Sequence, residues 1–244
     1  MITFSIKKKK NNMFFDELEY IGVDETGVGD YFSPIVSVAC FIPKENLELV
    51  KNLGIKDSKK ITDSKIIQIA EHIIKNNLVH FKDTTLSQKG YNNLIKIGIN
   101  NNSVKTLIHF NSIKRLLKKV GANKTIVIDQ YASIENMKKH IKALKERSIV
   151  KDLNIDDFNL ILETKAEEKF LSVACASVLA RYLLLNKMKL QKDNYQGFEF
   201  KLGASNPIID LGVEFVKKFS VDELENVAKV SFKTTNKILE KLNL

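Results

Sequence analysis

The order of predicted elements indicates an α/β protein built on a mixed, five-stranded sheet. Three strands come early in the chain, several helices follow, and the last two strands alternate with helices. Short connections let the first three strands pair as antiparallel neighbours, whereas the last two need crossover connections and should run parallel. The 244 residues are enough for one large domain, and 44% hydrophobic with 28% charged residues is typical of a globular chain.

Hydrophobic periodicity predicts the strands. Two of them lie within residues 19–42 and are joined by a turn that contains Gly27 and Gly29, and Pro43 ends the second. The fourth strand is a nearly continuous apolar run, which suits a strand buried on both faces. The third, fourth and fifth strands are expected at residues 79–86, 125–130 and 158–163.

The same periodicity predicts helices between and after the strands. Asp63 is expected to cap the second helix, and Pro207 to lie near the start of a late helix that reaches Phe219. The longest helix carries small residues suited to close packing. The other helices are expected at residues 46–53, 64–76, 87–97, 104–120, 134–145 and 164–191, and short helical pieces finish the chain.

The chain carries a net charge of +10, which suggests a polyanionic partner, most simply nucleic acid. Lysines position phosphates but read bases poorly, so we expect recognition of the backbone; simple compositional drift is the alternative. Residues 1–18 are predicted to be a basic N-terminal tail and residues 19–244 one domain. No apolar run approaches the ~20 residues of a membrane span, and the first residues do not resemble a signal peptide. We therefore expect a cytoplasmic protein, working as a monomer and without a membrane partner.

The two cysteines, Cys40 and Cys175, lie in apolar runs. Free cysteine is among the most buried residue types, and disulfides are rare in reducing compartments. Buried free thiols are therefore expected in preference to a disulfide.

Four acids are expected to gather at one edge of the sheet. Asp24 and Glu25 end the first strand, Asp129 ends the fourth, and Glu167 lies near the start of the longest helix. Ligands of open α/β sheets collect outside the carboxyl ends of such strands. Carboxylates that converge without nearby His or Cys indicate Mg²⁺ or Mn²⁺, and four are enough for two ions about 3.5–4 Å apart.

Each acid also has a simpler interpretation. Asp129 could form a turn or cap the next helix. Thr164 and Glu167 have the spacing of a capping box. Zinc is not expected, because the histidines show no ligand spacing; they are His72, His80, His109 and His140.

The turn Gly27-Val28-Gly29 lacks the third glycine of a dinucleotide-binding fingerprint. It favours a close approach of the backbone to a nucleic-acid strand, with N–H groups donated to phosphate or a 2′-hydroxyl. A plain tight turn is the alternative. Ser177 and Arg181 lie one turn apart on the longest helix, where packing is the default role for Ser177 and Arg181 could pair with an acid of the site. The loop before Asp63 offers Lys56, Ser58, Lys59 and Lys60 as phosphate contacts or as solvated surface.

Three motifs together resemble the type 2 ribonucleases H, in the family's order. They are DETGVGDYFSP at residues 24–34, KDSKKITD at 56–63 and TKAEEKFLSVACASVLAR at 164–181, with a strand ending in Asp129 between the last two. The chain looks more like ribonuclease HIII than HII. Val28 stands where HII has the centre of a Gly-Arg-Gly turn, and Glu167 stands where HII has aspartate. Residues 201–205 and 230–233 also resemble HIII segments.

The resemblance implies an RNase H-like fold with a helical C-terminal part, and an endonuclease that hydrolyses the RNA strand of RNA–DNA hybrids. It implies Mg²⁺ or Mn²⁺, and products with 5′-phosphate and 3′-hydroxyl ends. Carried over by motif, the catalytic metal ligands are Asp24, Glu25, Asp129 and Glu167. The candidates for binding the hybrid are Gly27, Val28, Gly29, Lys56, Ser58, Lys59, Lys60, Ser177 and Arg181.

Two features depart from the HIII pattern. HIII proteins commonly carry an N-terminal TBP-like domain, and only about twenty residues precede Asp24 here. Ser33 stands where HIII has glycine, which is expected to crowd the turn. Three alternatives stay open: HII-type cleavage at a single embedded ribonucleotide, a non-catalytic hybrid-binding protein, and a relative that cuts DNA.

Overall fold

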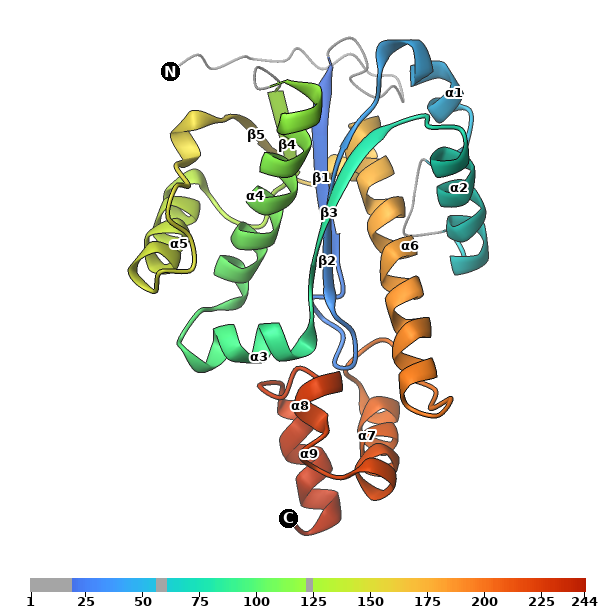
Figure 1. Cartoon of the computed structure of the whole chain (residues 1–244), viewed down its shortest axis with the longest axis vertical. Coiled ribbons are helices and arrows are strands. Elements are labelled where there is room, and N and C mark those ends of the chain that lie inside the picture. The colour runs from blue at the N-terminus through green and yellow to red at the C-terminus, as the bar shows by residue number, and fades with distance from the viewer. Residues whose placement is uncertain (1–18, 56–60, 122–124) are drawn as a thin grey trace.

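The computed structural model describes residues 19–55, 61–121 and 125–244, and it contains one five-stranded sheet (Figure 1). The strand order is β3-β2-β1-β4-β5. Neighbours β1–β2 and β2–β3 are antiparallel, whereas β1–β4 and β4–β5 are parallel, which confirms the predicted mixed sheet. The strands are β1 (Tyr20–Thr26), β2 (Ile35–Phe41), β3 (His80–Leu86), β4 (Thr125–Asp129) and β5 (Asn159–Glu163).

Helices cover both faces of this sheet. The helices α6 (Leu171–Asn194) and α2 (Asp63–Lys75) lie on one face, and α4 (Asn101–Val120) and α5 (Ile134–Glu146) lie on the other (Figure 1). Alternate residues of β2 therefore enter two separate hydrophobic clusters, and the apolar residues of β1, Ile21 and Val23, join the one on the α4 side. Every residue of β2 is buried, as expected for a strand covered on both sides.

The two cysteines face each other within the cluster on the α6 side. Cys40 on β2 and Cys175 on α6 are both buried and free, which confirms the prediction of free thiols. Burial raises the pKa of the Cys40 thiol, and so does its contact with Cys175. The Cys40 sulfur is therefore held in the unreactive thiol form.

A third cluster is formed by the C-terminal helices. It encloses Tyr31 and Phe32, which follow the glycine turn after β1. The C-terminal part thus packs on the segment that leaves the sheet beside Gly27, and it lies at one end of the molecule in Figure 1. The remaining elements are η1 (Lys44–Asn46), α1 (Leu47–Lys51), α3 (Gln88–Lys96), η3 (Ile155–Asp157), η4 (Ala166–Glu168), α7 (Asn206–Phe219), α8 (Leu224–Val227) and α9 (Lys233–Leu242).

The longest helix begins seven residues later than predicted. Residues 164–170 do not join α6; they form a turn and the short 3₁₀ helix η4, and Lys165 adopts the left-handed region at φ 53°. The Ala166 amide donates a hydrogen bond to Asp129 Oδ1 at 3.1 Å. This tertiary contact ties the segment to β4, and periodicity along the chain could not reveal it.

Two helix starts also differ from the prediction. Thr62, not Asp63, caps α2, and its hydroxyl accepts a hydrogen bond from the Lys65 amide. The helix α4 begins at Asn101 because the Asn100 side chain caps it and accepts from the Ser103 amide at 2.9 Å. Two predicted segments, the tail at residues 1–18 and the loop at 56–60, lie outside the described residues.

Among the described residues, α6 is long and apolar enough to cross a membrane by length and composition alone. However, 61% of its most apolar stretch is buried in the fold. Core helices of folded domains pass the same test, so this feature carries no membrane assignment.

Candidate active site

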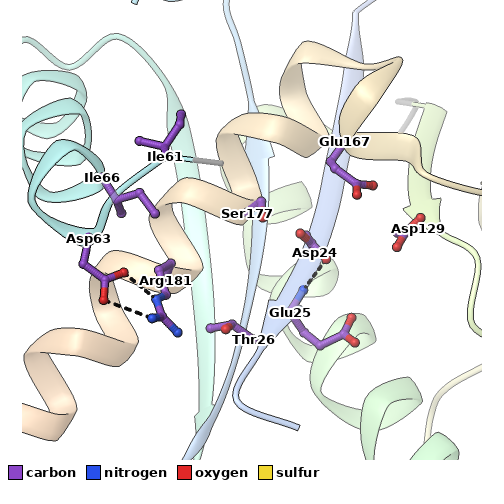
Figure 2. A pocket seen from close by; sticks show the side chains of 10 residues that line it. All are labelled: Asp24, Glu25, Thr26, Ile61, Asp63, Ile66, Asp129, Glu167, Ser177 and Arg181. Atoms are coloured by element: carbon purple, nitrogen blue, oxygen red, sulfur yellow. Dashed lines mark hydrogen bonds and ion pairs between the residues drawn. The ribbon is translucent and has the colours of Figure 1, made fainter. Parts of the chain in front are cut away.

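The carboxyl ends of β1 and β4 bring three of the predicted acids together. Val23 pairs with Ile128, so Asp24 and Asp129 follow side by side on neighbouring parallel strands. Glu167 reaches the same place from η4, where its side chain is 5% exposed. These acids and Glu25 line a cavity of about 370 Å³, which Ser177 and Arg181 also line (Figure 2).

Asp24 carries the least favourable charge of the site. Burial, then the negative charge of Glu25, raises its pKa to about 8, with a smaller contribution from Asp129. Two hydrogen bonds act in the opposite direction, one from the Ser177 hydroxyl and one from the Glu25 amide at 2.8 Å. Near neutral pH this carboxyl therefore needs a proton or a cation.

Glu25 points to the opposite face of the sheet, toward α4. Lys105 Nζ lies 2.7 Å from its Oε1, and His109 Nε2 lies 2.8 Å from its Oε2. Burial alone would raise the pKa of Glu25, but the hydrogen bond and charge of His109 and the charge of Lys105 lower it to about 2. The sequence reasoning missed both partners. The available signal was a lysine and a histidine four residues apart, on one face of a predicted helix.

The helix-capping interpretations of Asp129 and Glu167 are wrong. Ser133, not Asp129, caps α5, and the Asp129 carboxylate accepts from the Ala166 amide instead. No side chain caps η4, and the N-cap of α6 is Phe170, so Thr164 and Glu167 form no capping box. The contact of Asp129 with the Ala166 amide, next to Glu167, thus ties the two acids to the same cavity.

The donor set fits a hard divalent cation. Four carboxylates line one cavity, and burial of Asp24 beside two other acids leaves negative charge that a cation would balance. As the side chains stand, however, no three His, Cys, Asp or Glu within the described part of the chain are arranged to hold one metal ion together.

The glycine turn after β1 has two different glycines. Gly27 has φ +87°, and a Cβ there would meet the Pro34 carbonyl oxygen at 2.2 Å, so this position is fixed by the tight turn itself. Gly29 is exposed, and a Cβ placed there would meet no atom of the described residues within 4 Å. Val28 is partly buried against a neighbouring cluster. Ser33 is fully buried without crowding the turn, because its hydroxyl donates to the Gly27 carbonyl at 3.2 Å.

The other substrate-binding candidates divide into two groups. Ser177 contacts Asp24, so it has a polar role beyond packing. Arg181 was considered as a partner for one of the four acids, but it binds a different acid. Its Nε and Nη2 donate to the Asp63 carboxylate at 2.9 and 3.0 Å, and both residues line the cavity. The candidates Lys56, Ser58, Lys59 and Lys60 lie outside the described residues.

Comparison with known proteins places this chain in a family. The family model of ribonuclease HII matches residues 21–235. Ribonuclease HIII of Lactococcus lactis subsp. lactis is 36% identical over 222 residues, which is 90% of this chain and 72% of that protein. Ribonuclease HIII of Phytoplasma mali is also 36% identical, over 89% of this chain and 71% of its own length.

A solved structure agrees with these relatives. Bst-RNase HIII in complex with Mn²⁺ superposes with a TM-score of 0.82 at 28% identity, over 92% of this chain and 70% of that one. This match confirms the expected RNase H-like architecture. Both relatives and this solved structure are ribonucleases HIII, and the chain belongs to the ribonuclease HII family.

Proposed function

We propose that this protein is a metal-dependent endonuclease that hydrolyses the RNA strand of RNA–DNA hybrids. One observation carries the proposal: separate segments bring Asp24, Glu25, Asp129 and Glu167 to one cavity at the carboxyl ends of β1 and β4. The manganese complex of Bst-RNase HIII supports Mg²⁺ or Mn²⁺ as the cofactor. Residues 19–244 are proposed as the catalytic domain.

The four acids are proposed to hold the metal ions and to orient the scissile phosphate. Two bound ions would supply an activated water and stabilise the oxygen that leaves the phosphodiester, giving 5′-phosphate and 3′-hydroxyl ends. The charges of Glu25 and of Asp129 both act on Asp24, so Asp24 is the acid that would contribute to holding both ions. The Ser177 hydroxyl and the Ala166 amide hold Asp24 and Asp129 in position, respectively.

The hybrid is proposed to approach along the glycine turn. The space beside Gly29 is open, because a Cβ built there would meet no atom of the described residues within 4 Å. Since glycine has no side chain, a nucleic-acid backbone could approach the main chain closely at this position. Its amide could then donate to a phosphate or to the ribose 2′-hydroxyl, which distinguishes RNA from DNA. Arg181 at the cavity rim, together with the lysines Lys56, Lys59 and Lys60, would contact phosphates, and the net charge of +10 favours such a partner.

The test uses three labelled duplexes: a continuous RNA–DNA hybrid, DNA with one embedded ribonucleotide, and DNA alone. Each is incubated in Mg²⁺, Mn²⁺ or EDTA with the wild type, with Asp24→Asn and with the exposed control Asp152→Asn. We expect the wild type and the control to cut the continuous hybrid only with metal, and Asp24→Asn to bind the hybrid without cutting it.

The other outcomes separate the alternatives. Cleavage at the single ribonucleotide would indicate HII-type specificity, and cleavage of plain DNA would overturn the role of the glycine turn. Full activity of Asp24→Asn would refute the metal-ligand assignment. We also propose that the enzyme acts as a cytoplasmic monomer, which sedimentation and cell fractionation can test.

A further inference from the structure

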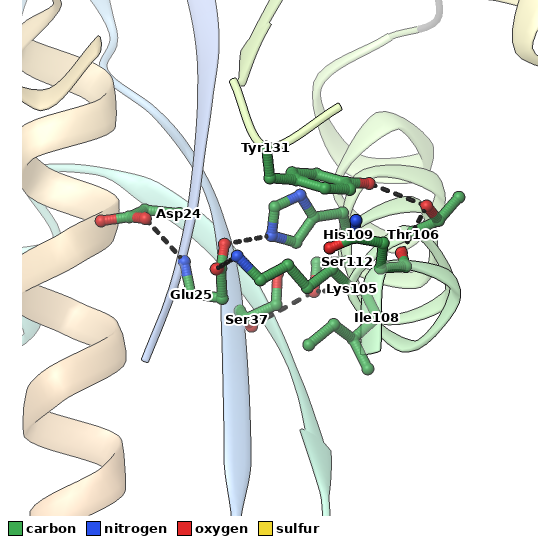
Figure 3. Close-up of polar contacts among 10 residues, drawn as sticks. Asp24, Glu25, Ser37, Lys105, Thr106, Ile108, His109, Ser112 and Tyr131 are labelled. Carbon is green, nitrogen blue, oxygen red and sulfur yellow. Dashed lines mark hydrogen bonds and ion pairs between the residues drawn. The ribbon is translucent and has the colours of Figure 1, made fainter. Parts of the chain in front are cut away.

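Both oxygens of the Glu25 carboxylate are already occupied by side chains of α4. Lys105 Nζ lies 2.7 Å from Oε1 and His109 Nε2 lies 2.8 Å from Oε2 (Figure 3). A carboxylate only accepts hydrogen bonds, so Nε2 carries the proton. Glu25 is 11% exposed, and His109 is fully buried. The acid that should face a metal ion is thus held by groups of this chain.

The α4 side chains are held firmly by their surroundings. Lys105 and His109 are four residues apart and so share one face of the helix. The Tyr131 ring packs edge-on against His109, with ring centroids 5.3 Å apart, and Lys105 Nζ lies 5.2 Å from the centre of the same ring. The Tyr131 hydroxyl is in turn hydrogen-bonded to Thr106 at 2.9 Å. Figure 3 shows this group beside the end of β1.

The two neighbouring acids of β1 therefore differ in their charge environment. The side-chain charges that act on Asp24 are those of Glu25 and Asp129, both negative. Glu25, by contrast, has an ammonium group at ion-pair distance. Negative charge attracts a divalent cation to Asp24. At Glu25, the ammonium group of Lys105 repels the cation and occupies the carboxylate oxygen that would bind it.

We propose that Lys105 is a resident cation at Glu25 that a divalent metal ion must displace, so that the metal ions load in order. The first ion binds on the Asp24 and Asp129 side. The second ion binds only when Lys105 leaves Glu25, which weakens its binding. This inference rests on the proposed function only in taking Glu25 as a metal ligand.

The test measures Mn²⁺ binding without nucleic acid, by calorimetry and by the spectroscopic signal of free Mn²⁺. Lys105→Met removes the ammonium and keeps the apolar stem against Tyr131, while Lys105→Arg keeps a cation. Lys138→Met is the matched control, because it removes an exposed lysine paired with Asp156 and changes the net charge equally.

We expect Lys105→Met to tighten the weaker Mn²⁺ site by at least about tenfold, since close like charges in a partly buried site repel strongly. Lys105→Arg and Lys138→Met should stay near the wild type. Adding Glu25→Gln to Lys105→Met should abolish the gain, which would show that the effect passes through Glu25.

Unchanged or weaker Mn²⁺ binding by Lys105→Met would overturn the inference, because Lys105 would then only orient Glu25. Thermal unfolding in EDTA checks that each variant folds. If Lys105→Met is unstable, Lys105→Gln replaces it, with the same expected direction. Because no hybrid is present, failure here is distinct from failure of the proposed hydrolysis.

Discussion

At Gly22, the backbones of β1 and α6, which both carry residues of the site, pack in direct contact. A Cβ built at Gly22 on β1 would lie 2.2 Å from the carbonyl carbon of Ser172 and 2.2 Å from the amide nitrogen of Val173. Both are backbone atoms of α6 and cannot rotate away. Ordinary contacts begin at 3.4 Å, so Gly22→Ala must separate β1 from α6 by about 1 Å.

This separation should reduce both stability and rate. Overpacking of a tight core costs about 1–3 kcal/mol, which for a chain of this size lowers the melting temperature by roughly 3–10 °C. The same movement displaces Ser177 and the η4 turn that carries Glu167 relative to Asp24. A misplacement of about 1 Å can reduce a rate by about 100-fold. Thermal unfolding in EDTA and steady-state cleavage of a continuous hybrid measure the two effects.

Gly29→Ala is the matched control for stability, because its new methyl group would meet no atom of the described residues within 4 Å. We expect Gly29→Ala to unfold at the temperature of the wild type. If Gly22→Ala also kept that temperature and the full rate, then α6 would not be fixed by this contact, and the argument from close approach would be wrong.

Two further predictions concern pH. The pKa of Asp24 is raised to about 8 in the folded protein. Between its unfolded pKa and pH 8, ionisation of Asp24 therefore lowers the free energy of unfolding, by up to about 1.4 kcal/mol for each pH unit. Asp24→Asn should unfold at a higher temperature than the wild type at pH 7 in EDTA, and an equal or lower temperature would contradict the assignment. The buried Lys229 donates to the Asp30 and Ser33 carbonyls, and burial lowers its pKa to about 7. The unfolded chain then binds more protons between about pH 7 and 10.5, so wild-type stability should rise across that window relative to Lys229→Met by up to about 1.4 kcal/mol per pH unit. Parallel stability curves for the two proteins would refute this.

The strands could be predicted closely because their signal is local. The run TIVID has apolar residues on both faces, and the structure buries its three central residues in an interior strand of the sheet, between β1 and β5. The start of α6 could not be predicted in the same way. Residues 164–170 have a helical composition, but the Ala166 amide binds Asp129, a partner 37 residues away. This tertiary contact determines where α6 begins, and hydrophobic periodicity along the sequence carries no information about such a contact.

The four acids could be found because strand ends and motif order mark them, but their partners could not. The chain has 39 basic residues, and nothing in the sequence separates Lys105, which binds Glu25, or the buried Lys229 from lysines on the surface. His109 was set aside for lack of ligand spacing. Its role is to bind an acid, and that needs only one correctly placed neighbour.

The adjacent carboxylates of Asp24 and Glu25 repel each other, and the fold relieves this repulsion by separating them. Side chains alternate along a strand, so β1 sends Asp24 toward α6 and Glu25 toward α4. Lys105 and His109 compensate Glu25, whose pKa falls to about 2, whereas no cationic side chain of the described residues lowers the pKa of Asp24, which rises to about 8. The demand for an external cation is therefore concentrated at Asp24. A site with its carboxylates equally exposed would bind two ions alike; this arrangement makes the two ions unequal before any substrate arrives.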